Sequence, residues 1–372
     1  MQFNQIIGQE PVKRLLKDMV QSGRMPHAQL LLGPEGCGKL ALALAFAQAA
    51  MCENPQAGDA CGACSQCSKA SKLIHPDIHF TFPTVGTNAL SSHFLEDWRT
   101  MLAEHPYFNA NQWLKAIGAE NKQGNINKEE CVSIIKRLSL KSFEGRYKIL
   151  IIWLPEYLQK EGNRLLKMIE EPPENTLFVL VAENQELILN TILSRCQMIK
   201  VNALTDEDIK TALQTKEGKS AEEAEMMTYL ADGNYNTALS LKEEKENDHA
   251  AVFLDWMRKC YQGNGVAMVK WVDAIATIGR ERQKHFLQYA LHFMREYMIM
   301  KITGNTKMRL RTEESVAAQK LAKIIAFEQI KEITELFDKC SYYIERNANP
   351  KVLFLDASIQ MHRLLKAKPL VS

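Results

Sequence analysis

The feature that most limits the fold is a glycine-rich loop between an apolar run and an apolar helical segment. Gln29–Leu32 leads into Gly33, Gly36, Gly38 and Lys39, with the spacing G-x-x-x-x-G-K. Glycines let successive backbone N–H groups turn toward phosphate oxygens, and the start of the following helix adds positive potential. Lys39 would reach the β- and γ-phosphates. The pattern predicts a phosphate-binding loop (P-loop); the alternative is a plain turn with a surface lysine.

This P-loop lacks the groups that hold Mg²⁺ in an ATPase. The residue after the lysine should carry a hydroxyl, but it is Leu40. The apolar run Ile149–Ile152 should end in acids, but it ends in Trp153 and Leu154. We therefore do not expect Mg²⁺-dependent hydrolysis, while ATP binding stays open. Glu156 is either a displaced base or, as we favour, a solvated glutamate at a helix start.

The part of the chain before Ala203 alternates short apolar runs with helical patterns. Such alternation predicts a parallel sheet with helices on both faces, an α/β fold. The expected strands are Gln29–Leu32, Ile78–Phe82, Lys148–Trp153, Leu177–Ala182 and Gln197–Val201.

The rest of the chain has helical periodicity and no convincing strand. We expect an α/β domain over residues 1–202, a small helical lid over 203–247 and an all-helical domain over 248–372. Within the first domain, the polar stretch Pro83–Asn127 contains two helical pieces and is predicted to decorate the sheet as an insertion.

The net charge argues against one class of function. The 46 Lys and Arg residues against 44 Asp and Glu residues give a charge of +2, which is not the strong basic footprint of a stand-alone DNA-binding protein. A zinc-dependent module that binds DNA by itself is therefore disfavoured. Any contact with nucleic acid is expected to be local or shared.

Two further stretches bear on location. The start, Met1–Gln5, has no basic segment followed by a leader-like apolar run, so we expect no secretory signal and a cytoplasmic protein. The longest apolar stretch, Leu40–Met51, is shorter than the roughly 20 residues that span a bilayer. No membrane partner is expected.

Four of the nine cysteines lie close together. Cys52, Cys61, Cys64 and Cys67 have the spacing C-x8-C-x2-C-x2-C. Two overlapping C-x2-C turns with a fourth thiolate suit a closed tetrahedral Zn²⁺ site, in which protein fills every position. We predict a structural zinc module over residues 52–67, with a redox dithiol or iron–sulfur ligation as alternatives.

Several motifs in this order resemble the AAA+ subunits of bacterial DNA polymerase III clamp loaders. The resemblance covers roughly Phe3 to Val201, while the helical remainder is similar to the family's lid and collar domains mainly in pattern. The motifs that carry it are the P-loop, the cysteine cluster, His75–Asp77, Asn163–Lys167, Glu170–Thr176 and Thr191–Cys196.

Within that family the chain is most similar to the delta prime subunits, which often have a degraded nucleotide site. Leu40 and the Trp153–Leu154 pair fit this, as does Asn236, since motor subunits carry a phosphate-sensing arginine there. Arg195, in a Ser-Arg-Cys motif, is retained. The resemblance implies that Arg195 acts in trans as an arginine finger on ATP bound by a neighbouring motor; taken alone, it would be a surface ion pair.

The resemblance also implies partners. These are the motor (gamma/tau) and delta subunits, held together by the helical collar, a sliding clamp, and primed DNA reached through the whole complex. The alternative within the family is an ATP-hydrolysing motor subunit that uses Lys39 and Glu156.

Overall fold

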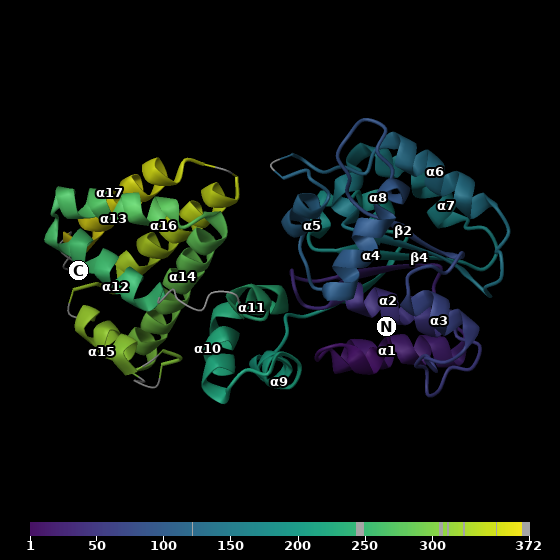
Figure 1. The fold of residues 1–372 in the computed structure, drawn as a ribbon, viewed down its shortest axis with the longest axis horizontal. Helices are drawn as coiled ribbons and strands as arrows, with labels where there is room; N and C mark the ends of the chain where they lie inside the picture. Colours follow the sequence, from purple (N-terminus) through teal and green to yellow (C-terminus); the bar gives the residue numbers. More distant parts are fainter. Residues whose placement is uncertain are drawn as a thin grey trace. The chain divides into compact units, whose positions relative to one another are not determined.

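The computed structural model describes residues 1–366 except 121, 243–248, 305–307, 311, 323 and 347. The chain forms two compact units, Met1–Leu239 and Ser240–Ser372 (Figure 1). The predicted boundary between lid and collar, at residues 247 and 248, lies outside the described residues. In the described part of the chain, no helix is both long enough and apolar enough to span a bilayer.

The first unit is built on a five-stranded parallel sheet in the order β2-β3-β4-β1-β5. The strands are β1 (Ala28–Leu32), β2 (Ile78–Thr81), β3 (Lys148–Trp153), β4 (Thr176–Ala182) and β5 (Gln197–Lys200). Every residue of β3 and β4 is buried, as expected for central strands covered on both faces. The predicted α/β fold is confirmed.

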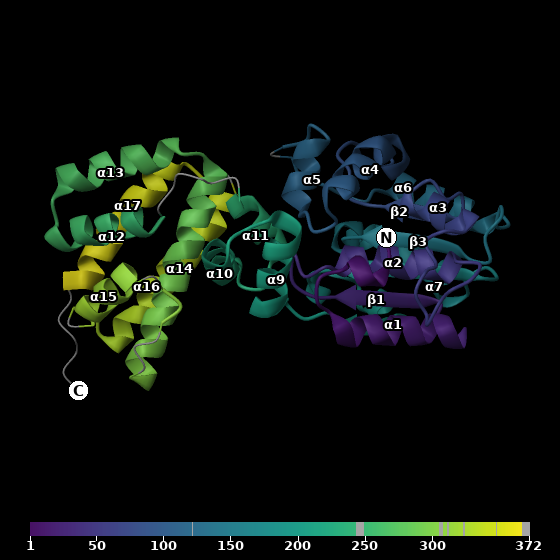
Figure 2. The same ribbon diagram turned by 60° about the horizontal axis from the view of Figure 1, so that its bottom comes forward.

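Helices cover the two faces of this sheet (Figures 1 and 2). On one face α2 (Lys39–Met51) contacts β1, β3 and β4, and α1 (Glu10–Ser22) and α3 (Ser65–Ser71) pack on it. All thirteen residues of α2 are buried, which explains why its sequence is apolar all round.

The other face carries a continuous apolar core with side chains from all the elements that cover it. These elements are α6 (Lys128–Ser139), η3 (Pro155–Leu165), α7 (Leu166–Glu170) and α8 (Asn190–Leu193). Pro172 and Pro173 follow α7 and prevent its continuation, as predicted.

The predicted insertion forms η2 (Ser91–Phe94), α4 (Leu95–Glu104) and α5 (Ala110–Ala116). Its Trp98 and Trp113 are fully buried, with ring centroids 5.2 Å apart in an edge-to-face arrangement. Both rings also pack on Phe82, just after β2. The insertion is therefore anchored to the sheet by an aromatic cluster.

The first unit ends in helices where the lid was predicted. They are α9 (Asp206–Glu217), α10 (Ala221–Ala231) and the start of α11 (Tyr235–Lys242). The hydroxyl of Thr205 caps α9 by accepting a hydrogen bond from the backbone N–H of Asp208. Ser220 caps α10 in the same way, with the N–H of Glu223 as donor. Both are capping boxes, a sequence pattern that favours a helix start.

The second unit is all helical in its described residues, which confirms the predicted helical class. Its helices are α12 (His249–Gln262), α13 (Gly265–Thr277), α14 (Arg280–Thr303), α15 (Thr312–Leu321), α16 (Phe327–Glu345) and α17 (Pro350–Lys366). Aromatic rings form its core, with Trp256 stacked on Trp271 at 5.0 Å and packed on Phe286 and Phe337.

Candidate functional site

The P-loop lies where the sequence places it, between the end of β1 and the start of α2. Gly36 and Gly38 have φ angles of 68° and 93°, which side-chain-bearing residues rarely adopt. Gly33 is required for another reason, because a Cβ there would lie 2.0 Å from the carbonyl oxygen of Val201. The loop therefore has the conformation that its glycines permit.

Lys39 is buried inside this loop. Its ammonium donates a hydrogen bond to the carbonyl oxygen of Pro34 and lies 3.8 Å from Oε1 of Glu183, which follows β4. The lysine is thus held by the chain's own oxygens.

The positions expected to hold Mg²⁺ are apolar and buried. Leu40 is in the core, and Leu154 is buried at the end of β3. Trp153 packs on Trp98 and Phe108, with ring centroids 5.3 and 5.2 Å away. The insertion therefore surrounds the end of β3 with aromatic rings at the place where an ATPase carries its acids.

Glu156 is not the solvated residue that we favoured from the sequence. It is buried, and its Oε1 accepts hydrogen bonds from the backbone N–H groups of Glu183 and Asn184 (2.8 Å for the second). It thus binds the backbone just beyond β4. Its Oε2 is buried without a hydrogen-bond partner in the structure. Burial raises the pKa of Glu156.

Carboxylates dominate the charge near Lys39. Burial raises the pKa of Glu183 to about 7; Lys39 opposes this rise, while the negative charges of Glu35 and Glu156 add to it. Solvent reaches 35% of the Glu183 side chain, so the group is only partly enclosed. The ammonium of Lys39 therefore already has a carboxylate neighbour, Glu183, where a P-loop lysine would contact phosphate.

Asn236 lies beside the loop, at the start of α11. It is buried, and its Nδ2 donates to Oε1 of Glu35 at 3.4 Å. Asn236, which the resemblance places at a phosphate-sensing position, therefore contacts a carboxylate of the P-loop itself.

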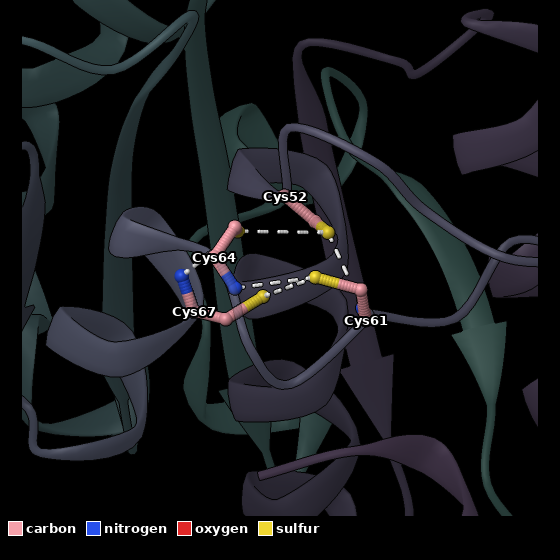
Figure 3. A group of neighbouring side chains, drawn as sticks. All are labelled: Cys52, Cys61, Cys64 and Cys67. Atoms are coloured by element: carbon pink, nitrogen blue, oxygen red, sulfur yellow. Dashed lines mark hydrogen bonds between the residues drawn. The ribbon is translucent and has the colours of Figure 1, made fainter.

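The four clustered cysteines converge as predicted (Figure 3). Their sulfurs all lie within 4.8 Å of one another, with 4.0 Å between Cys52 and Cys64 and 3.9 Å between Cys61 and Cys67. A tetrahedron with Zn–S bonds of about 2.3 Å has sulfurs about 3.8 Å apart. The donor set and its spacing fit a zinc ion.

Backbone N–H groups point at these sulfurs. The N–H of Cys61 donates to Sγ of Cys52 at 3.3 Å, and the N–H of Cys64 donates to Sγ of Cys61 at 3.4 Å. N–H groups of Ala63 and Cys64 lower the pKa of Cys61 to about 6, whereas burial raises the pKa of Cys52 and Cys67. Such N–H donors stabilise thiolates, the form that binds a metal.

The His75–Asp77 motif has a structural role that its sequence did not reveal. The carboxylate of Asp77 accepts hydrogen bonds from the N–H groups of Phe143, Glu144 and Gly145 at 2.6–2.9 Å. Burial alone would raise the pKa of Asp77, but these three donors lower it. His75 bonds Gln66 of the cysteine module. The motif therefore ties this module to the loop before β3.

Arg195 lies at the surface between α8 and β5. Its Nε and Nη2 donate to Oε2 of Glu170 at 3.2 and 3.1 Å, and its Nη1 donates to the carbonyl oxygen of Thr191 at 2.9 Å. The side chain is 30% exposed. The surface ion pair, which the sequence left as the alternative to an arginine finger, is present in the structure. The guanidinium has a defined orientation and is partly exposed to solvent.

Two residues of the site were missed from the sequence. Glu183 directly follows a strand of a parallel sheet, an edge where functional side chains gather, and that position was the available signal. Glu35 lies inside the P-loop motif, at a position that the motif leaves unspecified. Its partners are distant in sequence, so no local signal existed.

Comparisons with known proteins give matches in the part of the chain that carries these motifs. Residues 8–205 match the family described as "DNA polymerase III, delta subunit". The chain is 27% identical over 251 residues to DNA polymerase III subunit gamma of Buchnera aphidicola, covering 66% of this chain and 59% of that protein. It is 28% identical over 248 residues to subunit tau of Escherichia coli, covering 65% and 32%.

A third relative is DNA polymerase III subunit delta prime of Bacillus subtilis. The chain is 26% identical to it over 206 residues, covering 55% of this chain and 51% of that protein. In all three cases the match spans less than two thirds of the relative's own length.

Proposed function

The chain belongs to the DNA polymerase III delta subunit family, in the clamp-loader AAA+ group, and from this premise we propose that it is a clamp-loader subunit of the delta prime kind. In this proposal it does not hydrolyse ATP itself. It completes a ring with gamma/tau motor and delta subunits and helps to load a sliding clamp on primed DNA.

The observation that carries the proposal is the replacement of every expected Mg²⁺ ligand by a buried apolar side chain. Leu40 has no hydroxyl, and Trp153 and Leu154 have no carboxylate. Without a metal ion, the charge that develops on the transferred phosphoryl group is not neutralised. Trp153 is also part of an aromatic cluster, so an acid at this position would disrupt the packing around the end of β3.

Charge supports the proposal further. Glu183 lies 3.8 Å from the ammonium of Lys39, and Glu35 and Glu156 are close enough to raise the pKa of Glu183. The lysine therefore already has an acidic neighbour that a phosphate would have to displace. Lys39 already binds the carbonyl oxygen of Pro34 and lies beside Glu183. We infer weak ATP binding at most, with no role for Mg²⁺.

Arg195 is the residue that we propose to act in trans. Its exposed guanidinium could stabilise transition-state charge on ATP bound by a neighbouring motor subunit, since a planar guanidinium binds phosphate oxygens through two N–H groups. During hydrolysis, Arg195 would have to break its ion pair with Glu170 or bind Glu170 and the phosphate together. Such an exposed pair is worth only about 0–1 kcal/mol, so the cost is small.

We also propose the assignment of domains and metal. Residues 1–202 would be the AAA+ domain, 203–247 the lid and 248–372 a collar that holds the ring together. Cys52, Cys61, Cys64 and Cys67 would hold a structural Zn²⁺, which stabilises the module when bound. Through Gln66, His75 and Asp77 this module is bonded to the loop before β3.

A motor subunit of the gamma/tau kind is the second candidate. It is favoured by the match to gamma and tau proteins over about two thirds of this chain. The measurement that separates the two is Mg²⁺-ATP turnover by the isolated chain, with Lys39→Ala as the control for contaminating ATPases. The proposal predicts the same background rate for both; turnover that Lys39→Ala abolishes would identify a motor.

A further inference from the structure

One carboxylate in the P-loop is the meeting point of three segments of the first unit. Oε1 of Glu35 accepts hydrogen bonds from the Nδ2 atoms of Asn109, Asn234 and Asn236, at 3.1, 3.2 and 3.4 Å. Asn109 caps α5 in the insertion. Asn234 and Asn236 lie at the start of α11, far along the chain from the loop.

The backbone of α11 contacts the loop as well. The N–H of Tyr235 donates to the carbonyl oxygen of Gly36 at 3.1 Å. A Cβ on Gly36 would lie 1.7 Å from Oδ1 of Asn234, so glycine is needed for this close approach. The Tyr235 ring also packs edge-on against Tyr107 of the insertion, at 5.0 Å. The lid helix is therefore held on the loop by several kinds of contact.

Glu35 holds the centre of this arrangement. A carboxylate that accepts from neutral amides forms charge-assisted hydrogen bonds, which are stronger than those between neutral groups. Asn236 is 4% exposed, and its Oδ1 has no partner in the structure, so its bond to Glu35 is what satisfies part of a buried amide. Removing the carboxylate would leave several amide donors without this acceptor.

We propose that Glu35 is an internal latch that holds the start of α11 on the P-loop in place of a bound phosphate. The lid then keeps one position whether or not nucleotide is present. The latch predicts a lid that is insensitive to ATP. The latch concerns only contacts within the first unit, so its Glu35→Ala test does not depend on the proposed function; the insensitivity to ATP rests in part on the weak ATP binding proposed above.

Hydrogen exchange of the isolated full-length chain tests the latch. Glu35→Ala should speed the exchange of the amides of Tyr235–Leu239 about tenfold, since losing a hydrogen-bond acceptor weakens local protection by that order. Glu35→Gln keeps an amide oxygen that can accept and should change the rate much less. Glu174→Ala, at an exposed glutamate outside the site, is the matched control. Millimolar Mg²⁺-ATP should leave the parent protein's rates unchanged.

Two results would overturn the latch: unchanged exchange of Tyr235–Leu239 in folded Glu35→Ala, or slower exchange of these amides in the parent when ATP is added. Should Glu35→Ala fail to fold, Asn236→Ala removes the donor of the same hydrogen bond and should also speed the exchange of Tyr235–Leu239. Asn234 is less suitable for this, because its Oδ1 also accepts from the N–H of Thr237 and caps the helix. Neither measurement requires another subunit.

Discussion

Replacing Trp153 with Asp would restore an acid at the end of β3. We expect this substitution to destabilise the first unit and to create no ATPase activity. Trp153 is 3% exposed and packs on two aromatic rings. Losing a buried Trp side chain costs about 3–5 kcal/mol, and an unpartnered carboxylate in the cavity adds a desolvation cost. A typical domain has about 5–15 kcal/mol in total, so a large part of the first unit's stability would be lost.

The assay is urea unfolding followed by the near-ultraviolet circular dichroism of the aromatic rings, compared among the parent, Trp153→Asp and Trp153→Phe. Trp153→Phe keeps an aromatic ring in the cluster and should lose clearly less stability than Trp153→Asp. A Trp153→Asp protein with the parent's unfolding midpoint would refute this prediction. Mg²⁺-dependent ATP turnover by this variant would refute it equally.

The remaining predictions concern the metal and the charge near Lys39. Cys64→Ser should lower the zinc content from about one ion per chain and destabilise the first unit, whereas Cys340→Ala in the second unit should leave the zinc content unchanged; a metal-free parent that is fully folded would contradict the zinc assignment. For Glu183 the folded-state pKa of about 7 lies above its ordinary value, so the folded state binds the proton more tightly and stability falls as the pH rises from about 4.5 through 7. Glu183→Gln should flatten this slope in unfolding curves measured across that range; because solvent reaches the side chain, the slope is expected to be shallow, and an unchanged slope in the variant would assign it to other groups.

Local patterns were sufficient to predict the sheet and the P-loop. The runs that become β3 and β4 are apolar at nearly every position because both faces of the sheet are covered. The glycine spacing specified the loop, and the C-x2-C turns brought the four cysteines together. In each case the residues that interact are close in sequence or follow the period of one element.

What the sequence did not reveal depends on contacts between distant segments. Glu156 was expected in solvent, but it binds the backbone beyond β4, a strand that comes after the rest of η3 and α7. Asp77 serves a loop that comes after the whole insertion and α6. The bonds of Glu35 to Asn109 and Asn234 span 74 and 199 residues. Composition and periodicity do not predict such pairs, because a polar residue in a loop is compatible with the local sequence whatever its distant partner is.

The most direct test of the central claim is the ATPase rate of a reconstituted clamp loader that contains this chain with Arg195→Ala. We expect hydrolysis at the motor site facing Arg195 to fall by about 10³-fold or more, as for other arginine fingers, while the complex still assembles. Arg164→Ala is the matched control, since Arg164 is also a surface arginine paired with a glutamate, at 2.6 Å from Glu161. An Arg195→Ala complex that assembles and hydrolyses ATP at the parent's rate would contradict the account.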